Sequence, residues 1–190
     1  FSAAVFKIEG SKTELKNQRK NLIALAKDHN GIVAGGSTGE SGYNVTMVIA
    51  YIRELVVTQN VLGETMETAV PWSNIHQVKE EASNLIEKLH KEYNLPGKPF
   101  FCSRISKIYH TGVCMYNTIA MSFEGIENPE DVFTKIEHKM RENFIENGGS
   151  ISHHHGVGKL RKDFMSDTLS SGSIDLVRDI KKSQDPTNVF

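Results

Sequence analysis

The sequence predicts an α+β fold in which an antiparallel sheet carries helices packed on one face. Apolar residues recur at helical spacing over 75–89 and again over 132–144. Residues 61–70 predict a strand that ends at Pro71, and runs with the β-branched and aromatic enrichment typical of strands occupy 100–107 and 112–123. Because the last two runs are separated by a short loop and helices flank the strands, we expect an antiparallel sheet with its helices on one side.

The first 57 residues predict smaller elements. Residues 1–8 have the pattern of a strand, residues 15–26 place apolar side chains at helical spacing, and 32–34 follow as a second short strand. Segment 35–42 is rich in glycine but lacks the spacings of nucleotide-binding loops, so we expect a connecting loop. Residues 45–57 are apolar nearly throughout and predict a buried helix.

The middle of the chain has clearer boundaries. After the strand at 61–70, Ser73 is an N-cap candidate for an amphipathic helix that ends near Asn94. Beyond the two later strands, the sequence at 128–131 places an N-cap, a first-turn proline and two first-turn acids in order. A second amphipathic helix is therefore expected from there to Gly148.

The C-terminal part is expected to be an appendage. Residues 169–183 predict one or two short helices, and Asp185-Pro186 predicts a closing turn. We therefore divide the chain into an α+β domain at 1–147 and a segment at 148–190 that packs elsewhere.

The composition is that of a folded protein. Of 190 residues, 38% are hydrophobic and 24% are charged, with a formal net charge of -1, which argues against disorder and gives no indication of a nucleic-acid partner. Cys102 and Cys114 lie in strand-like apolar runs and are expected to be buried thiols, with no disulfide framework. No run approaches the roughly 18 apolar residues of a membrane-spanning helix.

The segment from Gly148 to Lys162 is the most informative part of the chain. It holds three consecutive histidines between glycines, followed at once by three cations. The glycines allow positive φ and close approach to a ligand, while His153, His154 and His155 offer donors, acceptors or protons that titrate near neutral pH. The segment therefore predicts a site for a polar ligand.

Three explanations compete for this segment. A purification tag would stand at a terminus, whereas this run is internal. For a metal, neighbours on a strand point to opposite faces, so at most two of the histidines, 153 and 155, could share an ion, and further ligands are missing nearby; we assign no metal. An anion fits better, because Lys159, Arg161 and Lys162 add positive charge and the glycine backbone can offer N–H groups in a nest.

Two further residues carry possible chemistry. Arg53 lies in an apolar run where its neighbour Glu54 cannot face it, so a buried guanidinium there needs another carboxylate or a bound anion. Tyr116 lies in the middle of a strand, where a tyrosine is usually a core residue. The residues alone favour a structural role for both, and Tyr109 and His110 are alternatives in the neighbouring loop.

A family resemblance changes these preferences. Residues 148–162 closely resemble the signature of the alkyldihydroxyacetonephosphate synthase family, flavoenzymes that form the ether bond of ether phospholipids. More generally, the chain resembles the C-terminal half of vanillyl-alcohol-oxidase-type FAD-linked flavoproteins, in which 1–147 would be the substrate-binding cap domain. The resemblance covers most of the chain in the family's order and spacing, through Tyr51-Ile-Arg-Glu-Leu, Val61-Leu-Gly-Glu-Thr with Pro71-Trp72, Tyr109-His-Thr-Gly-Val-Cys-Met-Tyr116, and Asp185-Pro-Thr-Asn-Val-Phe190.

The resemblance implies a transferase of ether-lipid biosynthesis. The family exchanges the acyl group of 1-acyl-dihydroxyacetone phosphate for a long-chain fatty alcohol and releases a fatty acid, through a covalent adduct at flavin N5 and without net redox. FAD would be bound mainly by a domain upstream of Phe1, with no cofactor-binding residue in this chain. We expect that domain to precede a chain that starts without methionine inside a predicted strand, and the C-terminal helical tail to pack with it. A homodimer, peripheral membrane contact and a peroxisomal location are also implied.

The resemblance assigns roles to the candidate residues. The matching tyrosine is the catalytic acid/base, which gives Tyr116 the proton transfer, and the matching arginine contacts the substrate phosphate, which gives that role to Arg53. His153, His154 and His155 are expected to orient substrate and flavin. A tyrosine ordinarily titrates near pH 10, so its role needs cations nearby, which the histidine segment can supply. A channel for alkyl chains would draw on large apolar residues that otherwise pack in the core, namely Trp72, Phe100, Phe101, Met47 and Met66.

Two other functions stay open. One is an FAD-linked 2-hydroxy-acid or alcohol dehydrogenase of the same superfamily, which would consume an electron acceptor. The other is a non-enzymatic α+β module that binds an anion or a metal through its histidines.

Overall fold

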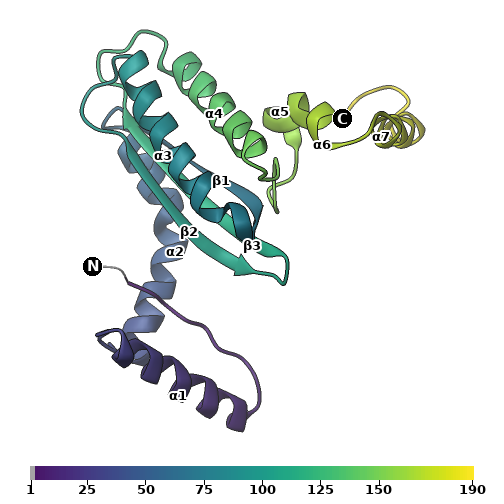
Figure 1. The fold of residues 1–190 in the computed structure, drawn as a ribbon. Coiled ribbons are helices and arrows are strands. Elements are labelled where there is room, and N and C mark those ends of the chain that lie inside the picture. The colour runs from purple at the N-terminus through teal and green to yellow at the C-terminus, as the bar shows by residue number, and fades with distance from the viewer. Residues whose placement is uncertain (1–2) are drawn as a thin grey trace. The chain divides into compact units, whose positions relative to one another are not determined.

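The structure is a computed structural model that describes residues 3–190, apart from the side chains of residues 46, 47, 49 and 50. The chain divides into two compact units, one of residues 1–55 and one of residues 56–190. The second unit contains the sheet and its helices (Figure 1).

A three-stranded antiparallel sheet forms the centre of the second unit. Its strands are β1 (Val61–Pro71), β2 (Phe100–Ile108) and β3 (Gly112–Ser122), in the spatial order β1-β3-β2. All three strands were predicted, and the α+β class is confirmed. A register shift between Ile105 and Lys107 interrupts the β2–β3 ladder.

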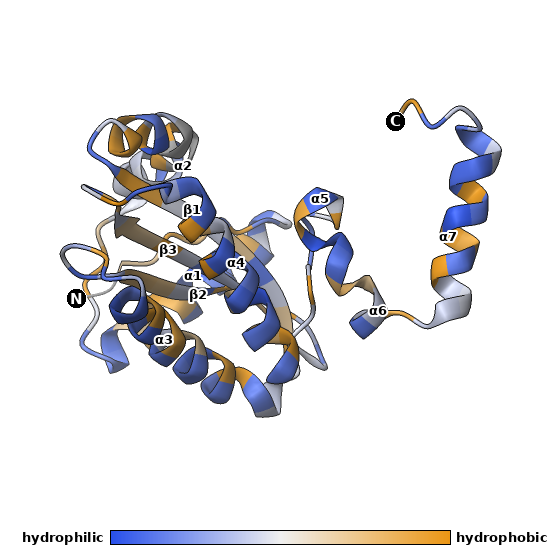
Figure 2. Cartoon of the chain, turned by 90° about the horizontal axis from the view of Figure 1, so that it is seen from above, coloured by the Kyte–Doolittle hydropathy of each residue, from blue (hydrophilic) through white to orange (hydrophobic). Residues whose placement is uncertain are grey.

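Helices α3 (Ile75–Glu92) and α4 (Pro129–Glu146) cover one face of this sheet (Figure 1). Their apolar stripes are visible as alternating orange and blue along α3 in Figure 2. The core between helices and sheet is apolar and almost fully buried, with members from α3, α4, β1 and β3 such as Ile86, Met140 and Ile119. Burial of these stripes is what fixes both helices on the sheet.

The starts of these two helices differ in part from the prediction. A 3-10 turn, η1 (Trp72–Asn74), precedes α3, and the side chain of Ser73 donates to Asn74 Oδ1 instead of capping the helix. The predicted N-cap of α3 is therefore wrong by one residue. Before α4, Asn128 takes the N-cap position with a left-handed φ of 55° and Pro129 opens the helix as predicted.

The first unit contains helices but no strand among its described residues. Helix α1 (Lys12–Asp28) starts with a Ser11–Glu14 capping box, and α2 (Gly36–Val57) follows. The strands predicted at 1–8 and 32–34 are wrong for residues 3–8 and 32–34, which have no neighbouring strand to complete a ladder; residues 1 and 2 lie outside the described part.

Helix α2 also differs from its prediction. It begins at Gly36, so most of the predicted connecting loop at 35–42 is helical; within it Gly42 leaves room for Val5, whose Cγ2 would lie 2.9 Å from an added Cβ. The helix predicted at 45–57 is present, but its described side chains are exposed or half-buried, so its predicted burial is wrong. Exposed apolar residues include Tyr51 and Leu55.

Residues 158–184 form a series of short helices and one 3-10 turn. They form α5 (Gly158–Arg161), a 3-10 turn η2 (Lys162–Phe164), α6 (Met165–Thr168) and α7 (Ser171–Gln184). Only α7 lies in the region where helices were predicted. The predicted closing turn is present, because Asp185 accepts the backbone N–H groups of Val189 and Phe190.

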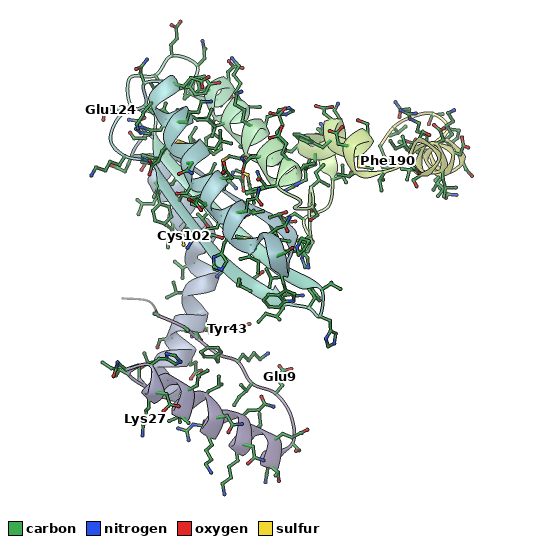
Figure 3. All side chains as sticks on the ribbon, in the orientation of Figure 1. Glu9, Lys27, Tyr43, Cys102, Glu124 and Phe190 are labelled. Atoms are coloured by element: carbon green, nitrogen blue, oxygen red, sulfur yellow. The ribbon has the colours of Figure 1, made fainter. Side chains whose placement is uncertain are left out.

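One cysteine is exposed. Cys114 is buried on β3 as predicted, whereas Cys102 on β2, labelled in Figure 3, is accessible, so its predicted burial is wrong. Among the described residues, no helix has both the length and the apolar character that crossing a bilayer would require.

Candidate functional site

One row of residues crosses the sheet on the face opposite α3 and α4. The register pairs Glu67 of β1 with Tyr116 of β3, and Tyr116 with Arg104 of β2. Directly opposed residues of neighbouring strands point to the same face, and the alternate positions, such as Met66 and Met115, belong to the helix-covered core. We call the face that carries Glu67, Tyr116 and Arg104 the histidine face, because the histidine segment lies over it.

The free edge of β1 determines where the histidine segment crosses the sheet. After α4, Gly148 turns the chain with a φ of 82°. Ser150 then pairs with the edge: its N–H donates to the Ala69 carbonyl at 2.9 Å, and its Oγ accepts the Ala69 N–H at 2.8 Å. The Thr68 hydroxyl donates to the Ser150 carbonyl at 2.7 Å. These bonds deliver the following residues onto the histidine face.

A buried carboxylate organises the histidine turn. Glu67 is 2% exposed, and its Oε1 accepts the backbone N–H groups of His153, His154 and His155 at 2.9, 3.0 and 2.8 Å. The Ser152 hydroxyl donates to the same oxygen at 2.7 Å. Consecutive N–H groups that converge in this way form an anion nest. The nest in the structure is formed by the N–H groups of residues 153–155 rather than by the glycines from which a nest was predicted, and it holds a carboxylate of the protein itself.

These hydrogen bonds keep Glu67 charged. Burial alone would raise the pKa of Glu67, but the His155 N–H, the Ser152 hydroxyl and the N–H groups of His154 and His153 outweigh it and lower the pKa to about 2. Glu67 is therefore a carboxylate at neutral pH.

The second oxygen of Glu67 faces two cations or potential cations. Oε2 lies 2.8 Å from Nδ1 of His155 and 3.8 Å from Nη2 of Arg161, and it is buried without a hydrogen bond from any described group. Arg161 is itself buried, and its Nη1 donates to the Gly156 carbonyl at 3.2 Å. Of the three cations predicted to attract an anion, Arg161 is thus turned inward, whereas Lys159 and Lys162 are exposed.

Tyr116 lies half-buried among rings and a guanidinium. Its ring centroid is 6.0 Å from that of His154 at an interplanar angle of 25°, and 5.7 Å from that of His155 at 89°. The Arg104 guanidinium carbon lies 4.8 Å from the Tyr116 centroid, and the Tyr116 hydroxyl donates to Thr65 Oγ1 at 3.2 Å. The arrangement places positive and titratable groups around a phenol.

The remaining histidine contacts run toward Tyr109. The Tyr109 hydroxyl and His153 Nε2 are 2.8 Å apart, and Nδ1 of His153 and Nδ1 of His154 are 2.9 Å apart. Cys114 Sγ joins this group, since it and one nitrogen of each of these histidines lie within 4.8 Å of one another. The prediction that at most His153 and His155 could share an ion is wrong, because the segment bends rather than forming a strand and brings the rings of His153 and His154 together. The two Nδ1 atoms lie at hydrogen-bond distance, and a metal ion that used both of them would need both without a proton.

The structure therefore brings Tyr116, His153, His154 and His155 together, as the assigned roles require. Arg53 belongs to the first unit, where its side chain is exposed on α2 and no ion pair to it is found among the described residues. The predicted buried guanidinium is wrong, and the structural ion pair loses its support.

The alkyl-channel residues do not share one environment. Met66 is in the helix-covered core and Phe101 packs against it, whereas Phe100 is exposed. Trp72 is also exposed, and its Nε1 donates to the carbonyls of Tyr109 and His110. The Met47 side chain lies outside the described part.

Sequence reasoning missed Glu67 and Arg104. A charged residue in the middle of the strand predicted at 61–70 was the available signal for Glu67, because a buried carboxylate needs partners. Arg104 becomes recognisable only through the strand register, which joins residues far apart in sequence.

Comparison with known proteins identifies the family. Residues 2–190 match the family model described as FAD linked oxidases, C-terminal domain. The chain belongs to this family. Within the FAD-linked oxidase C-terminal domain family, it is 36% identical over 188 residues to alkyldihydroxyacetonephosphate synthase of Caenorhabditis elegans, covering 99% of this chain and 32% of that protein. The enzyme of the same name from Dictyostelium discoideum is 27% identical, covering 98% and 30%.

The fold of this FAD-linked oxidase C-terminal domain agrees with a solved structure. A structure of alkyldihydroxyacetonephosphate synthase superposes with a TM-score of 0.63 at 23% identity, over 94% of this chain and 28% of that one. The chain spans about a third of the length of the curated synthases that it matches. An uncharacterized FAD-linked oxidoreductase of Escherichia coli is also similar, at 27% identity over 75% of this chain.

Proposed function

We propose that the whole protein acts in ether-lipid biosynthesis, as a transferase that replaces the acyl group of 1-acyl-dihydroxyacetone phosphate by a long-chain alcohol. The observation that carries the proposal is the group formed by Tyr116 and the three histidines around buried Glu67, in a chain similar over its length to alkyldihydroxyacetonephosphate synthases. In this exchange the C1–O bond to the acyl group breaks, a C1–O bond to the alcohol forms, and the alcohol proton balances the fatty acid that leaves.

Tyr116 is assigned to proton transfer at substrate C1. Within the described part of the chain its hydroxyl donates to a neutral partner, Thr65 Oγ1, and its ring has Arg104, His154 and His155 beside it. General acid/base catalysis by a phenol needs charged groups beside it, and the Arg104 guanidinium is such a group.

The histidines are assigned to substrate and flavin orientation. Their backbones are fixed on Glu67, while the side chain of His155 is 30% exposed and His154 is exposed as well. Rigid backbone with accessible imidazoles is what an orienting group needs.

Arg53 is assigned to the substrate phosphate. Its guanidinium is exposed and has no ion pair in the described part of the chain, and its planar fork suits a phosphate by two parallel hydrogen bonds.

FAD is the proposed cofactor, and when bound it would supply a flavin ring that accepts electron density from the substrate without net oxidation. The described residues fit contact with such a ring rather than with its pyrophosphate: the imidazoles are accessible, whereas the glycines of segment 35–42 lie mostly in α2 and form no phosphate-binding loop. We propose that FAD is held mainly by another part of the protein. A homodimer, peripheral membrane contact and a peroxisomal location are proposed on the family resemblance alone.

Stoichiometry tests the proposal. The full-length FAD-loaded protein is supplied with acyl-dihydroxyacetone phosphate and a long-chain alcohol, and ether product, fatty acid and electron-acceptor consumption are measured together. We expect one fatty acid for each ether formed, with no acceptor consumed. Acceptor reduction on a 2-hydroxy acid or an alcohol, without ether formation, would instead identify a dehydrogenase, a function left open by the similar oxidoreductase of Escherichia coli.

A further inference from the structure

We infer that Glu67 is a positioning residue that holds the proton of His155 on Nδ1 and thereby leaves Nε2 as the hydrogen-bond acceptor that the site offers to a hydroxyl group. The inference rests on the proposed function for the identity of that hydroxyl, which is the one of the long-chain alcohol. The assignment of the proton itself rests on geometry alone.

The contact between His155 and Glu67 is two-sided. The backbone N–H of His155 donates to Oε1 at 2.8 Å, while Nδ1 of its ring lies 2.8 Å from Oε2. One residue thus contacts both oxygens of a carboxylate whose side chain is fully buried.

The buried oxygen decides where the proton lies. A neutral imidazole carries its proton on one nitrogen and a lone pair on the other. If Nε2 carried the proton, the Nδ1 lone pair would face a carboxylate oxygen at 2.8 Å, and the two would repel each other. A proton on Nδ1 turns this repulsion into an attraction between the N–H group and the carboxylate, a close charged contact at an oxygen that has no partner of hydrogen-bond geometry among the described groups. Arg161 lies farther from Oε2, at 3.8 Å, and its Nη1 is engaged by Gly156, so it does not replace the imidazole as donor.

The opposite nitrogen is then an available acceptor. No hydrogen bond to His155 Nε2 is found among the described residues, and the side chain is 30% exposed. Its ring neighbours are Tyr116, edge-on at 5.7 Å, and His154 at 4.5 Å. His155 differs in this from His153, whose two nitrogens contact Tyr109 and His154. Of the three histidines, His155 is the one whose tautomer is set by a fixed charge.

The ligand class follows from these groups. An unprotonated imidazole nitrogen accepts a hydrogen bond from a neutral hydroxyl group. The ionised oxygens of a phosphate or a carboxylate carry no proton, so they cannot donate a hydrogen bond to it. This matches an alcohol substrate that must lose its proton on bond formation.

The test is nitrogen NMR of the full-length FAD-loaded protein with 15N-labelled histidine, at about pH 8, above the ordinary histidine pKa of about 6.5. The His155 signals are assigned by their loss in His155→Gln. We expect a protonated Nδ1 and a bare Nε2. In Glu67→Gln the amide group turned toward the ring is a donor, so the proton should move to Nε2. Glu64→Gln, a change on the same strand but on the helix-covered face, should leave the wild-type pattern.

Each result has a definite meaning. A wild-type His155 with its proton on Nε2, or on both nitrogens, would overturn the inference, and this spectrum suffices if Glu67→Gln does not fold. A proton that stays on Nδ1 in folded Glu67→Gln would also overturn it. In activity, Glu67→Gln should lower kcat by about the 10⁴-fold seen when the carboxylate of a Ser-His-Asp triad becomes an amide. The expected tautomer in a protein that forms no ether bond would reject the proposed function and leave the positioning role intact.

Discussion

Glu67 is a buried carboxylate, and an isolated charge in such an environment would be strongly unfavourable. Four hydrogen bonds to Oε1 and an imidazole nitrogen at Oε2 offset its desolvation, and in return the carboxylate fixes the backbone of three successive histidines. Because the donors come mostly from the backbone, the turn depends on the charge of residue 67 more than on the identity of the histidine side chains.

The low pKa of Glu67 predicts a specific pH dependence of stability. Its folded pKa of about 2 lies below the reference value of 4.5, so the stabilisation is complete above about pH 5 and is lost as pH falls toward the folded pKa. At neutral pH, Glu67→Gln should reduce the free energy of unfolding by on the order of 3 kcal/mol. The difference between the two proteins should shrink between about pH 5 and pH 2, as followed by denaturant unfolding. A difference independent of pH in that window would contradict the carboxylate's role.

Tyr116→Phe separates chemistry from packing. The change removes one hydroxyl whose described partner is Thr65 Oγ1 at 3.2 Å, so stability should fall by no more than about 1 kcal/mol. The rate of hydrogen exchange at substrate C1 and the rate of ether formation in the full-length protein should fall by roughly 10²–10⁴-fold. Tyr93→Phe, at a half-buried tyrosine packed against the core, is the matched control and should keep both rates. Native exchange in Tyr116→Phe would transfer the role of base to another group of the site.

Arg53→Lys tests the phosphate contact. Lysine keeps the charge but cannot form two parallel hydrogen bonds, so the KM for acyl-dihydroxyacetone phosphate should rise and turnover should fall. Arg19→Lys, on exposed α1 of the same unit, is the control and should change neither. Equal kinetics in the two variants would remove Arg53 from the substrate site.

At the scale of elements, the turn that follows α4 and pairs with the edge of β1 fixes the histidine segment in place. The turn at 148–150 fills the narrow space between the end of α4 and the edge of the sheet. A Cβ added to Gly149 would lie 2.5 Å from Thr68 Oγ1 and 2.8 Å from the Phe144 carbonyl oxygen. Only glycine fits there without displacing β1 or α4, so the turn holds helix and strand at a fixed separation.

Gly149→Ala should therefore destabilise the protein by about 1–3 kcal/mol, as overpacking does. It should also reduce activity, because the Ser150–Ala69 pairing that follows would shift. Gly172→Ala is the matched control: it lies in α7 with nothing within 4 Å of the added Cβ, and alanine there should stabilise by about 0.5–1 kcal/mol. Thermal melting and ether formation of both variants check this. A harmless Gly149→Ala would show that the turn is not tightly packed.

The sequence was sufficient for elements whose side-chain period matches their burial. Helices α3 and α4 carry such patterns and were predicted from them, whereas the strands were predicted from residue composition and bounding turns. The segments at 3–8 and 32–34 have strand composition but no partner strand, and the glycines of 36–42 are helical against their propensity, so local pattern failed there. In the site, the histidines and Tyr116 were recognisable as types. Glu67 was missed although its charge in the middle of a predicted strand was a signal, and Arg104 becomes recognisable only through the β-sheet register.

At the scale of the whole molecule, several apolar side chains are exposed in both units. They include Tyr51 and Leu55 on α2 and Leu176 and Ile180 on α7, which shows the amphipathic pattern in Figure 2. Grouped apolar exposure is typical of surfaces that contact other protein parts. This agrees with the proposal that the tail packs with an FAD-binding domain, in a protein whose relatives are about three times as long as the chain. The division of the chain at residue 147 stays a prediction.

Whether residues 1–190 retain FAD tests the proposal that another part of the protein binds the cofactor. Residues 1–190 produced alone should carry no FAD after purification, because their described part offers accessible imidazoles but no loop for a pyrophosphate. The full-length protein should show the flavin absorbance of about one FAD per chain. Circular dichroism and a cooperative melt of the short chain are needed beside the absorbance, so that lost binding is not confused with lost folding. A folded short chain that retains stoichiometric FAD would place the cofactor-binding residues within these 190 residues and would reject the assignment of FAD to another part of the protein.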